Sequence, residues 1–481
     1  MRAVKTGAVA ATLTAGTFAL MNITTVVSLR GLAAESEYGL SAVFFYLFAA
    51  LFFLIPVSLV AAELATGWPQ EGGVFRWIGA AFGQRLGLLA IYLQWLATTI
   101  CFPTMLIFAA VALAYTGNYP AHNAELAASK DYTLAVVLAV YWLATFITLH
   151  GVKSASRISA LGGLIGTLIP ALILLVCGIW YVASGHPVHL AWSWDGLLPQ
   201  HMQWQTWVLA ASIFLYYSGM EINAVHVRQL EQPSRNYPLS IAITAVVTVV
   251  VLILGTLTIS AVLPHNDMNL VQGLLHTYDL IFSAMGCPWL GQILAAMLAI
   301  GVLGQVTVIV AGPSSGLLVV GREGMLPRWM QQVNRHGVQR NILLLQGAIV
   351  SVLSIVLVCL PSVQAAFQIL GQLSGLLYLL MYILLFAAAI ALRYRAPEVV
   401  RPYQIPGGKA GMWLVGGAGF CATGVAFILS FMPPSQIVVG SAALYVGILI
   451  VGAIGFVSVP FILYALRRPE WNTAGNNTEN I

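Results

Sequence analysis

Charged side chains are scarce in this sequence. They make up 7% of its 481 residues, while hydrophobic residues make up 60%. Soluble domains carry roughly 25% charged residues, so the composition excludes an ordinary soluble protein and leaves no stretch that reads as a separate soluble domain. It predicts a polytopic membrane protein.

The motifs of several enzyme and binding classes are also missing. The five cysteines are scattered singly and form no C-x-x-C pair, so neither a disulfide framework nor a zinc site is indicated. No Walker A loop and no G-x-G-x-x-G motif before a helix is present, which removes support for ATP-driven transport. The histidines are dispersed, which argues against a membrane-embedded enzyme. We expect no cofactor, no metal and no nucleic-acid partner.

What the sequence does contain is a series of apolar runs of about 20 residues, the length that spans a bilayer. They predict an all-α protein of about twelve transmembrane helices, with the first run a membrane helix and not a cleaved signal peptide. The runs cover residues 7–30, 40–66, 84–115, 132–150, 157–183, 204–227, 238–263, 289–319, 341–360, 363–393, 411–432 and 439–466.

The basic residues give this topology an orientation. Eighteen of the 20 lysines and arginines fall in the predicted cytoplasmic segments, and only Arg30 and Lys130 fall on the other side. The positive-inside rule predicts such an asymmetry. Both termini are therefore expected in the cytoplasm, with residues 468–481 as a short cytoplasmic tail behind a single transporter domain of residues 1–467.

A polar stretch in the middle of the chain interrupts the sixth run. It spans residues 216–223 and holds Tyr216, Tyr217, Ser218, Gly219 and Glu221. An ionisable residue at membrane depth costs about 2.5–3.5 kcal/mol on insertion scales, and glycine weakens a helix. The stretch predicts a broken helix with Glu221 beside a polar cavity, and broken helices near the midplane are where secondary transporters bind substrate. The alternative is a glutamate that only ties two helices together.

A second interruption is expected in the first run, at Asn22, Ile23, Thr24 and Thr25, because hydroxyl side chains can bond backbone carbonyls and bend a helix. The first and sixth runs open two halves of opposite topology, residues 7–183 and 204–393, followed by two further helices at 411–466. This is the pattern of an inverted repeat.

Other polar residues at membrane depth extend the candidate site. Gln305 in the eighth run is the one we assign to substrate binding, while Glu63 near the cytoplasmic end of the second run is expected to lie at the interface or pair with a loop arginine. The glycine-led segment 71–77 predicts a short interfacial helix.

Several motifs carry a resemblance to a known family. The segments Ala61-Ala62-Glu63-Leu64-Ala65-Thr66, Gly219-Met220-Glu221 and Ile405-Pro406-Gly407-Gly408-Lys409 match in order and spacing. With their neighbours they resemble the amino acid–polyamine–organocation superfamily, in particular its bacterial glutamate/GABA antiporter family. Arg30, and Gln305 where that antiporter has a glutamate, depart from the pattern.

The resemblance implies a leucine-transporter-like fold of five plus five inverted repeats and two further helices. It implies an amino acid antiporter of the bacterial inner membrane, a monomer or homodimer, that works by alternating access on amino acid or amine substrates. It places Ile23, Thr24 and Thr25 at the substrate on an unwound first helix, and gives Glu221 a gating, proton-linked role. From their position at membrane depth, we also assign Asn22, residues 216–219 and Gln305 to substrate binding.

Two rival functions stay open beside exchange. Proton-coupled uptake is one, although the fifth run lacks the internal lysine of proton-coupled relatives. A substrate-sensing receptor on a transporter scaffold is the other.

The topology is testable with single cysteines. Replacing Lys130 and Arg401 in turn by cysteine should place the two thiols on opposite sides of the membrane, because the basic residues orient the chain. Labelling with a membrane-impermeant thiol reagent from each side measures this. Two thiols that both react from outside would contradict twelve helices with both ends inside.

Overall fold

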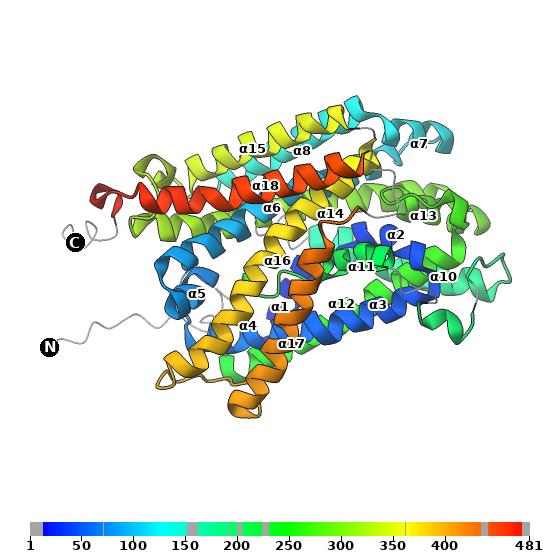
Figure 1. Ribbon diagram of the computed structural model, residues 1–481. Coiled ribbons are helices and arrows are strands. Elements are labelled where there is room, and N and C mark those ends of the chain that lie inside the picture. Colours follow the sequence, from blue (N-terminus) through cyan, green and yellow to red (C-terminus); the bar gives the residue numbers. More distant parts are fainter. Residues whose placement is uncertain are drawn as a thin grey trace.

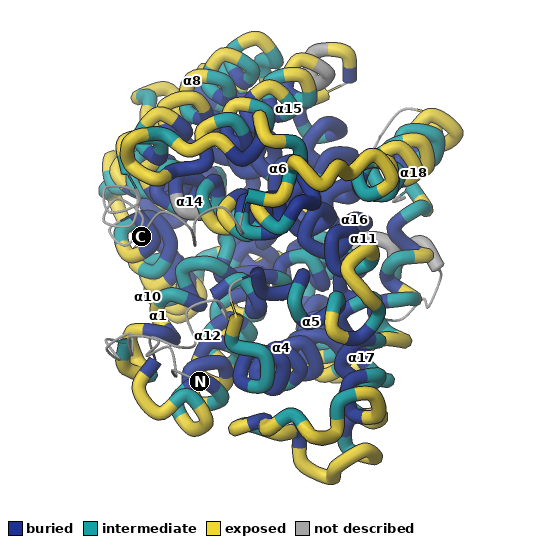
Figure 2. Tube along the Cα trace, turned by 90° about the vertical axis from the view of Figure 1, so that its left-hand side faces the viewer, coloured by how far each residue is buried: buried dark blue, intermediate teal, exposed yellow. Residues whose placement is uncertain are grey.

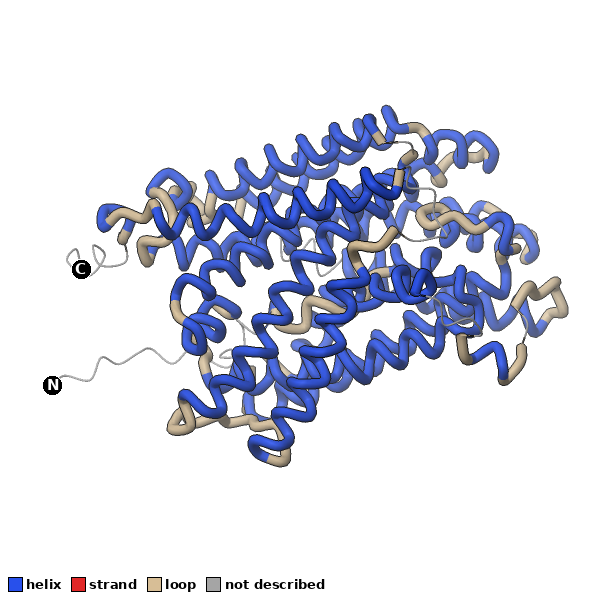
Figure 3. The backbone as a smooth tube through the Cα atoms, in the orientation of Figure 1, coloured by secondary structure: helices blue, strands red, loops and turns tan. Residues whose placement is uncertain are grey.

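The computed structural model describes residues 13–70, 72–151, 162–190, 192–199, 204–223, 230–360, 362–433 and 441–473. Helices dominate this part of the chain (Figure 3), and two isolated bridges, Leu13 with Leu230 and Glu323 with Asn472, are its only strand-like pairings. The all-helical fold that the sequence predicts is confirmed for these residues.

Most elements are α-helices, and four 3₁₀ or π segments lie next to the helices of the candidate site and its surroundings. The α-helices are α1 (Ala15–Val26), α2 (Leu32–Glu35), α3 (Ala42–Ala49), α4 (Ile55–Gly67), α5 (Val74–Phe82), α6 (Gln84–Ala114), α7 (Pro120–Ala128), α8 (Lys130–Leu149), α10 (Ile169–Ala183), α11 (Trp204–Tyr216), α12 (Pro233–Val262), α13 (Gly273–Ala284), α14 (Trp289–Arg322), α15 (Arg340–Cys359), α16 (Val363–Arg395), α17 (Gly408–Leu429) and α18 (Ala442–Ala465). The segments are the 3₁₀ helices η1 (Leu29–Gly31), η2 (Ser36–Ser41) and η8 (Arg328–Gln331) and the π-helix η4 (Leu164–Leu168).

By length and hydropathy, nine helical stretches in the described residues are able to cross a membrane. The first of them, 15–67, has 53 residues and is not one rod, because Gly39 has φ 54° and ψ −130° and ends the helical path. It holds the first two predicted runs. Two further predicted runs are not among these nine stretches. The sixth run is broken, which leaves the 13 residues of α11, and the ninth run corresponds to α15. Each predicted run thus has a helical counterpart.

The helices form two groups (Figure 1). α12 lies along α1, α3 and α4, while α6, α8, α14 and α15 contact one another. Burial follows this arrangement: α6 is buried almost throughout, whereas α8, α15 and α18 turn exposed faces outward (Figure 2). The exposed residues of these outer helices are largely apolar, as at Phe146, Val352 and Ile454. This is the surface that a lipid environment requires.

Glycines allow one close helix contact between the two predicted halves. A Cβ atom on Gly166 of η4 would lie 2.1 Å from the Cα of Gly301 on α14, and a Cβ on Gly301 would lie 2.4 Å from the Cα of Gly166. Any larger side chain at either position would force the backbones apart. Small residues at helix contacts are typical of membrane bundles.

Contacts between connecting segments gather at the two ends of the helices. At one end, the Lys130 side chain donates to the carbonyl of Leu360, and the Tyr115 hydroxyl donates to Gln272. At the other end, Arg76 of α5 pairs with Glu323. α5 confirms the short helix expected after Gly72, and it packs on α6 and α16. The short helices α7 and α13 lay outside the sequence-based expectations.

The start of the predicted tail is held against the connection after α14. The Gln331 side chain donates to the Trp471 carbonyl over 2.8 Å, and the Thr473 amide donates to the Arg322 carbonyl over 2.9 Å. The rest of the tail lies outside the described residues.

Glu63 is buried and paired, which confirms the expected arginine partner. Its carboxylate lies 2.7 Å from Nη2 of Arg393 and 3.5 Å from Nε of Arg401, and it accepts a 2.9 Å hydrogen bond from the amide of Ile405. The cluster joins α4, the end of α16 and the loop before α17. It buries Arg401, so the exposed Arg335 is the better position for the cytoplasmic cysteine of the topology test. Removing one partner of a buried pair costs about 3–5 kcal/mol because the remaining charge stays buried.

We therefore expect Glu63→Gln to lower stability markedly, because it leaves two buried guanidinium groups without a countercharge. Glu323→Gln is the matched control, since the Arg76–Glu323 pair is about a quarter exposed and such pairs contribute about 0–1 kcal/mol. Thermal unfolding of purified protein in detergent measures both. Equal losses in the two variants would contradict a structural role specific to Glu63.

Candidate functional site

The sixth predicted helix is broken where the sequence places the break. α11 ends at Tyr216, and Gly219 has φ 106°, a conformation that side chains other than glycine rarely adopt. The amide of Gly219 no longer has a helical partner and donates instead to the Tyr382 hydroxyl of α16 over 2.9 Å. A neighbouring helix thus satisfies a backbone group that the break sets free, as membrane depth requires.

The first break lies a few residues later than predicted. α1 continues through Val26, so residues 22–25 are helical, and the chain leaves the helix at Val27 and Ser28 before η1 begins. The reason is that both threonine hydroxyls donate to the Met21 carbonyl, Thr24 over 3.0 Å and Thr25 over 2.8 Å. These bonds are satisfied inside the helical turn, so they do not open the backbone.

The two breaks lie against each other. The Asn223 side chain, just after the second break, donates to Oδ1 of Asn22 over 3.0 Å and to the Thr25 hydroxyl over 3.1 Å. From α14, the Gln305 side chain reaches the Thr25 carbonyl at 3.5 Å. Segments about 200 residues apart therefore form one polar centre.

A cavity of about 70 Å³ opens between these segments. Typical ligand pockets measure about 300–1,000 Å³, so the cavity is too small for a substrate unless its walls move. Its lining comes from both breaks and from α6, α14 and α16. The lining residues are Thr25, Val26, Ser28, Arg30, Thr98, Cys101, Met105, Leu215, Tyr216, Ser218, Gly219, Ile222, Gln305, Ile309, Ser374 and Tyr378.

Five of the nine residues assigned to substrate binding line this cavity: Thr25, Tyr216, Ser218, Gly219 and Gln305. The other four lie behind it in supporting positions. Asn22 bonds Asn223, Ile23 is buried, Thr24 packs where a side chain on Gly163 would otherwise sit, and the Tyr217 hydroxyl faces the Tyr46 carbonyl at 3.3 Å.

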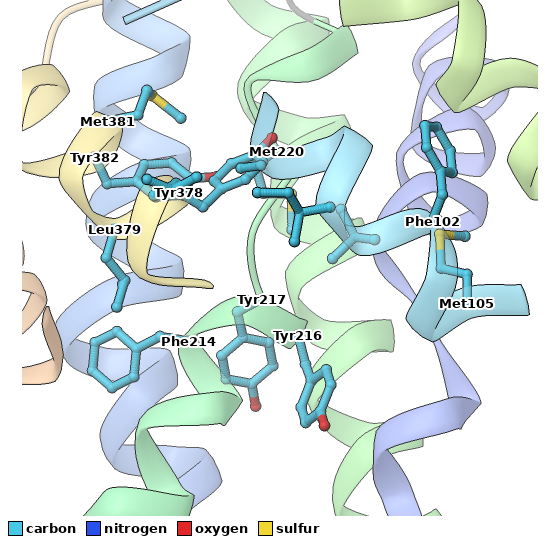
Figure 4. Close-up of a cluster of buried hydrophobic side chains, with 14 of the residues drawn as sticks. Phe102, Met105, Phe214, Tyr216, Tyr217, Met220, Tyr378, Leu379, Met381 and Tyr382 are labelled. Atoms are coloured by element: carbon cyan, nitrogen blue, oxygen red, sulfur yellow. The ribbon is translucent and has the colours of Figure 1, made fainter. Parts of the chain in front are cut away.

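Glu221 is almost fully buried beside the second break. Its carboxylate accepts hydrogen bonds from Gln94 over 3.0 Å, Tyr378 over 2.9 Å and Tyr382 over 2.6 Å. Figure 4 shows the two tyrosine rings extending from α16 toward the break at Met220. Among the described residues no lysine, arginine or histidine lies within 4 Å of this carboxylate. Its charge is therefore held by neutral donors, and Tyr378 separates it from the cavity.

Sequence reasoning missed several lining residues, of which Arg30 matters most. It was placed outside the membrane at the end of the first run, but the structure places it in the cavity wall, with Nη2 3.1 Å from the sulfur of Cys101. The sequence did contain a signal, because Arg30 is one of only two basic residues that fall outside the predicted cytoplasmic segments. Tyr378 and Cys101 gave no comparable signal, since both occur in continuous apolar helices.

The charge of the cavity is one-sided. None of its lining residues is an aspartate or glutamate, and Arg30 is the only lysine or arginine among them. The described residues also contain no group of three histidine, cysteine or acidic side chains able to hold a metal ion. Chemically, the site offers hydroxyls, amides, break-exposed backbone and one guanidinium, which suits binding of a small polar molecule.

Comparison with known proteins decides the family. Residues 13–454 match the family described as amino acid permease. The chain belongs to this amino acid permease family. It is therefore a membrane-embedded, multi-pass transporter and not an enzyme, as the sequence-based resemblance to the larger superfamily indicates.

Relatives of this permease include proteins named as antiporters. It is 39% identical to an uncharacterized transporter of Legionella pneumophila over 94% of this chain and 96% of the relative. It is 32% identical to a glutamate/gamma-aminobutyrate antiporter of Lactococcus lactis over 89% of this chain and 85% of the relative. A probable agmatine/putrescine antiporter of the same species is 23% identical over 81% of each chain. The permease family thus spans relatives named for acidic, neutral and amine substrates.

Proposed function

We propose that this permease is an amino acid antiporter that works by alternating access. The observation that carries the proposal is the meeting of two helix breaks at a small cavity, since broken helices supply backbone groups to substrates in secondary transporters. The similarity to an antiporter at 32% identity over most of both chains supports exchange. The proposal includes twelve crossings in a bacterial inner membrane, with both termini in the cytoplasm.

The moving parts in this proposal are two helix groups. The first comprises α1, α3, α4, α11 and α12, and the second comprises α6, α8, α14 and α15. Contacts within each group are extensive, and α1 touches α14 at few points. The groups follow from a repeat of 7–183 against 204–393, with α17 and α18 outside it. Rocking one group against the other would open the cavity to either side.

Substrate binding is assigned to the break residues. Carbonyls at the second break, near Ser218, would meet the substrate ammonium group, while the Gly219 carbonyl accepts from the Ile222 amide over 3.1 Å. The hydroxyl of Thr25 and the amide of Gln305 would fix its orientation, and the Tyr216 ring would close over it. Tyr216 suits this role because its ring packs directly on Gly31, where a Cβ would lie 2.3 Å from the ring.

Proton-coupled uptake is the rival in the same class. Residues 157–183 of the fifth run contain no lysine, and at Gly163 the space for a side chain is filled by Thr24, whose methyl carbon would lie 2.6 Å from a Cβ there. Both observations favour exchange.

Exchange predicts that transport depends on a substrate on both sides. Liposomes loaded with an amino acid should take up the labelled amino acid far faster than empty liposomes. The reason is that an exchanger without bound substrate returns only slowly to its outward-facing state. Counterflow across a panel of amino acids and amines measures this and identifies the pair. Equal uptake by empty liposomes under a proton gradient would favour the uptake alternative.

Glu221 is proposed to carry the pH dependence and part of the gate. Protonation would add a donor to a carboxylate that now accepts three hydrogen bonds, so the tyrosines of α16 would have to rearrange. Glu221→Gln should therefore flatten the pH profile of exchange, while Glu221→Asp should retain a dependence.

The control for this prediction is Asp279→Asn. Burial raises the pKa of the Asp279 carboxyl to about 6, so it also titrates in the range of interest, but it lies on α13, away from the cavity. Exchange normalised to inserted protein is measured across pH for each variant. A profile of Glu221→Gln identical to that of the parent would remove this residue from the mechanism and leave it a tie between helices.

A further inference from the structure

Arg30 occupies the junction of several cavities. It follows the first break directly, in η1, and lines the main cavity together with two adjoining ones of about 20 Å³ each. Its side chain is partly exposed to this internal space. A guanidinium group presents its donors in a planar fork that matches a carboxylate.

The guanidinium has no carboxylate partner in the described part of the chain. No aspartate or glutamate there lies within 4 Å of it, and its hydrogen bond among these residues is to the sulfur of Cys101. Glu35 lies five residues further on and is fully buried, but it accepts instead from the Ser212 hydroxyl over 2.5 Å. By contrast, Arg393 and Arg401 share Glu63. A cation held at membrane depth without a counter-ion is costly.

Two buried carboxylates, Glu35 and Glu221, lie near the cavity, and neither of them lines it. Glu221 is covered by its three donors, and none of the residues that line the cavity is acidic. A second ammonium group on a substrate would find no carboxylate here, whereas a carboxylate would find Arg30. The closed site thus favours substrates by the sign of their charge.

We propose that Arg30 binds a carboxylate of the transported molecule, so that the permease accepts amino acids and rejects amines that lack a carboxylate. The inference rests on the proposed transport function and adds the residue that sets the substrate class. The bound group is either the α-carboxylate or a side-chain carboxylate, and both present the same chemistry to a guanidinium.

Cys101 gives a binding readout that does not need transport. The starting protein has Cys177, Cys287, Cys359 and Cys421 replaced by alanine, which leaves the cavity thiol alone. The rate at which a small methanethiosulfonate reagent modifies Cys101 is measured with increasing glutamate, glutamine or putrescine. We expect glutamate to protect the thiol and putrescine to leave it unprotected.

Arg30→Gln should raise the half-protecting concentration at least about tenfold, because charge-assisted hydrogen bonds are lost. It should also reduce the preference of Cys101 for an anionic over a cationic reagent. Arg30→Lys, which keeps the charge without the fork, should restore part of both effects. Arg335→Gln, on the exposed loop before α15, is the matched control and should change neither.

Comparison of glutamate with glutamine distinguishes binding of the α-carboxylate from binding of the side-chain carboxylate. Loss of protection by glutamate and glutamine alike assigns the α-carboxylate, and loss for glutamate alone assigns the side chain. Protection that is unchanged in Arg30→Gln, or protection by putrescine in the parent, would overturn the proposal. Carboxylate protection without counterflow would instead refute the antiporter function while keeping this site, so the two failures are separable.

Discussion

Backbone groups set free at membrane depth need partners, and this requirement organises the centre of the protein. The break after α11 frees the amide of Gly219, which Tyr382 of α16 accepts, and the end of α1 presents the Thr25 carbonyl, which Gln305 of α14 approaches. An unpaired polar group in hydrocarbon costs several kcal/mol. The partners are supplied by helices outside the broken pair, so the same contacts that stabilise the breaks also tie them to their surroundings.

The sequence predicted the second break well and the first one less well. At the second, a glycine interrupts an apolar run and weakens the helix locally, and the nearby carboxylate marks a polar site at membrane depth. At the first, Thr24 and Thr25 resemble a helix-bending pair, yet their hydroxyls close on Met21 within the turn. The actual break at Val27 and Ser28 has no local signal, because neither residue type disfavours a helix strongly.

The contacts that complete the site were beyond sequence reasoning. Tyr378 and Tyr382 lie in a continuous apolar helix, where a tyrosine reads as packing, and their pairing with Glu221 spans more than 150 residues. Arg30 stands at the end of an apolar run, so the sequence predicts that it lies in water outside the membrane. In the structure it belongs to the 3₁₀ helix η1 and lines the cavity. Glu63 was accessible to prediction because arginines cluster in the neighbouring loops. Local sequence features thus predict helix breaks and ion pairs better than they predict which distant helix will contact them.

The buried carboxylates of this chain show why pairing decides their role. Glu63 is paired with two arginines, which stay positively charged. Loss of the Glu63 charge would therefore leave both guanidinium groups without this carboxylate partner. Glu221 is held by two hydroxyls and an amide, groups that can reverse or release a hydrogen bond at a cost of about 0.5–1.5 kcal/mol each when a partner remains. The partners of Glu221 can therefore rearrange without leaving an arginine unpaired.

Tyr378 connects this carboxylate to the substrate space. Among the three groups that donate to Glu221, it alone also lines the cavity. A molecule that engages the Tyr378 hydroxyl competes directly with Glu221 for the same proton donor. In the proposed mechanism, occupancy of the cavity and the hydrogen bonding of Glu221 are coupled through this side chain, so that by reciprocity a change at Glu221 alters affinity in the cavity. The coupling needs no long pathway, because Glu221, α16 and the second break share a single set of contacts.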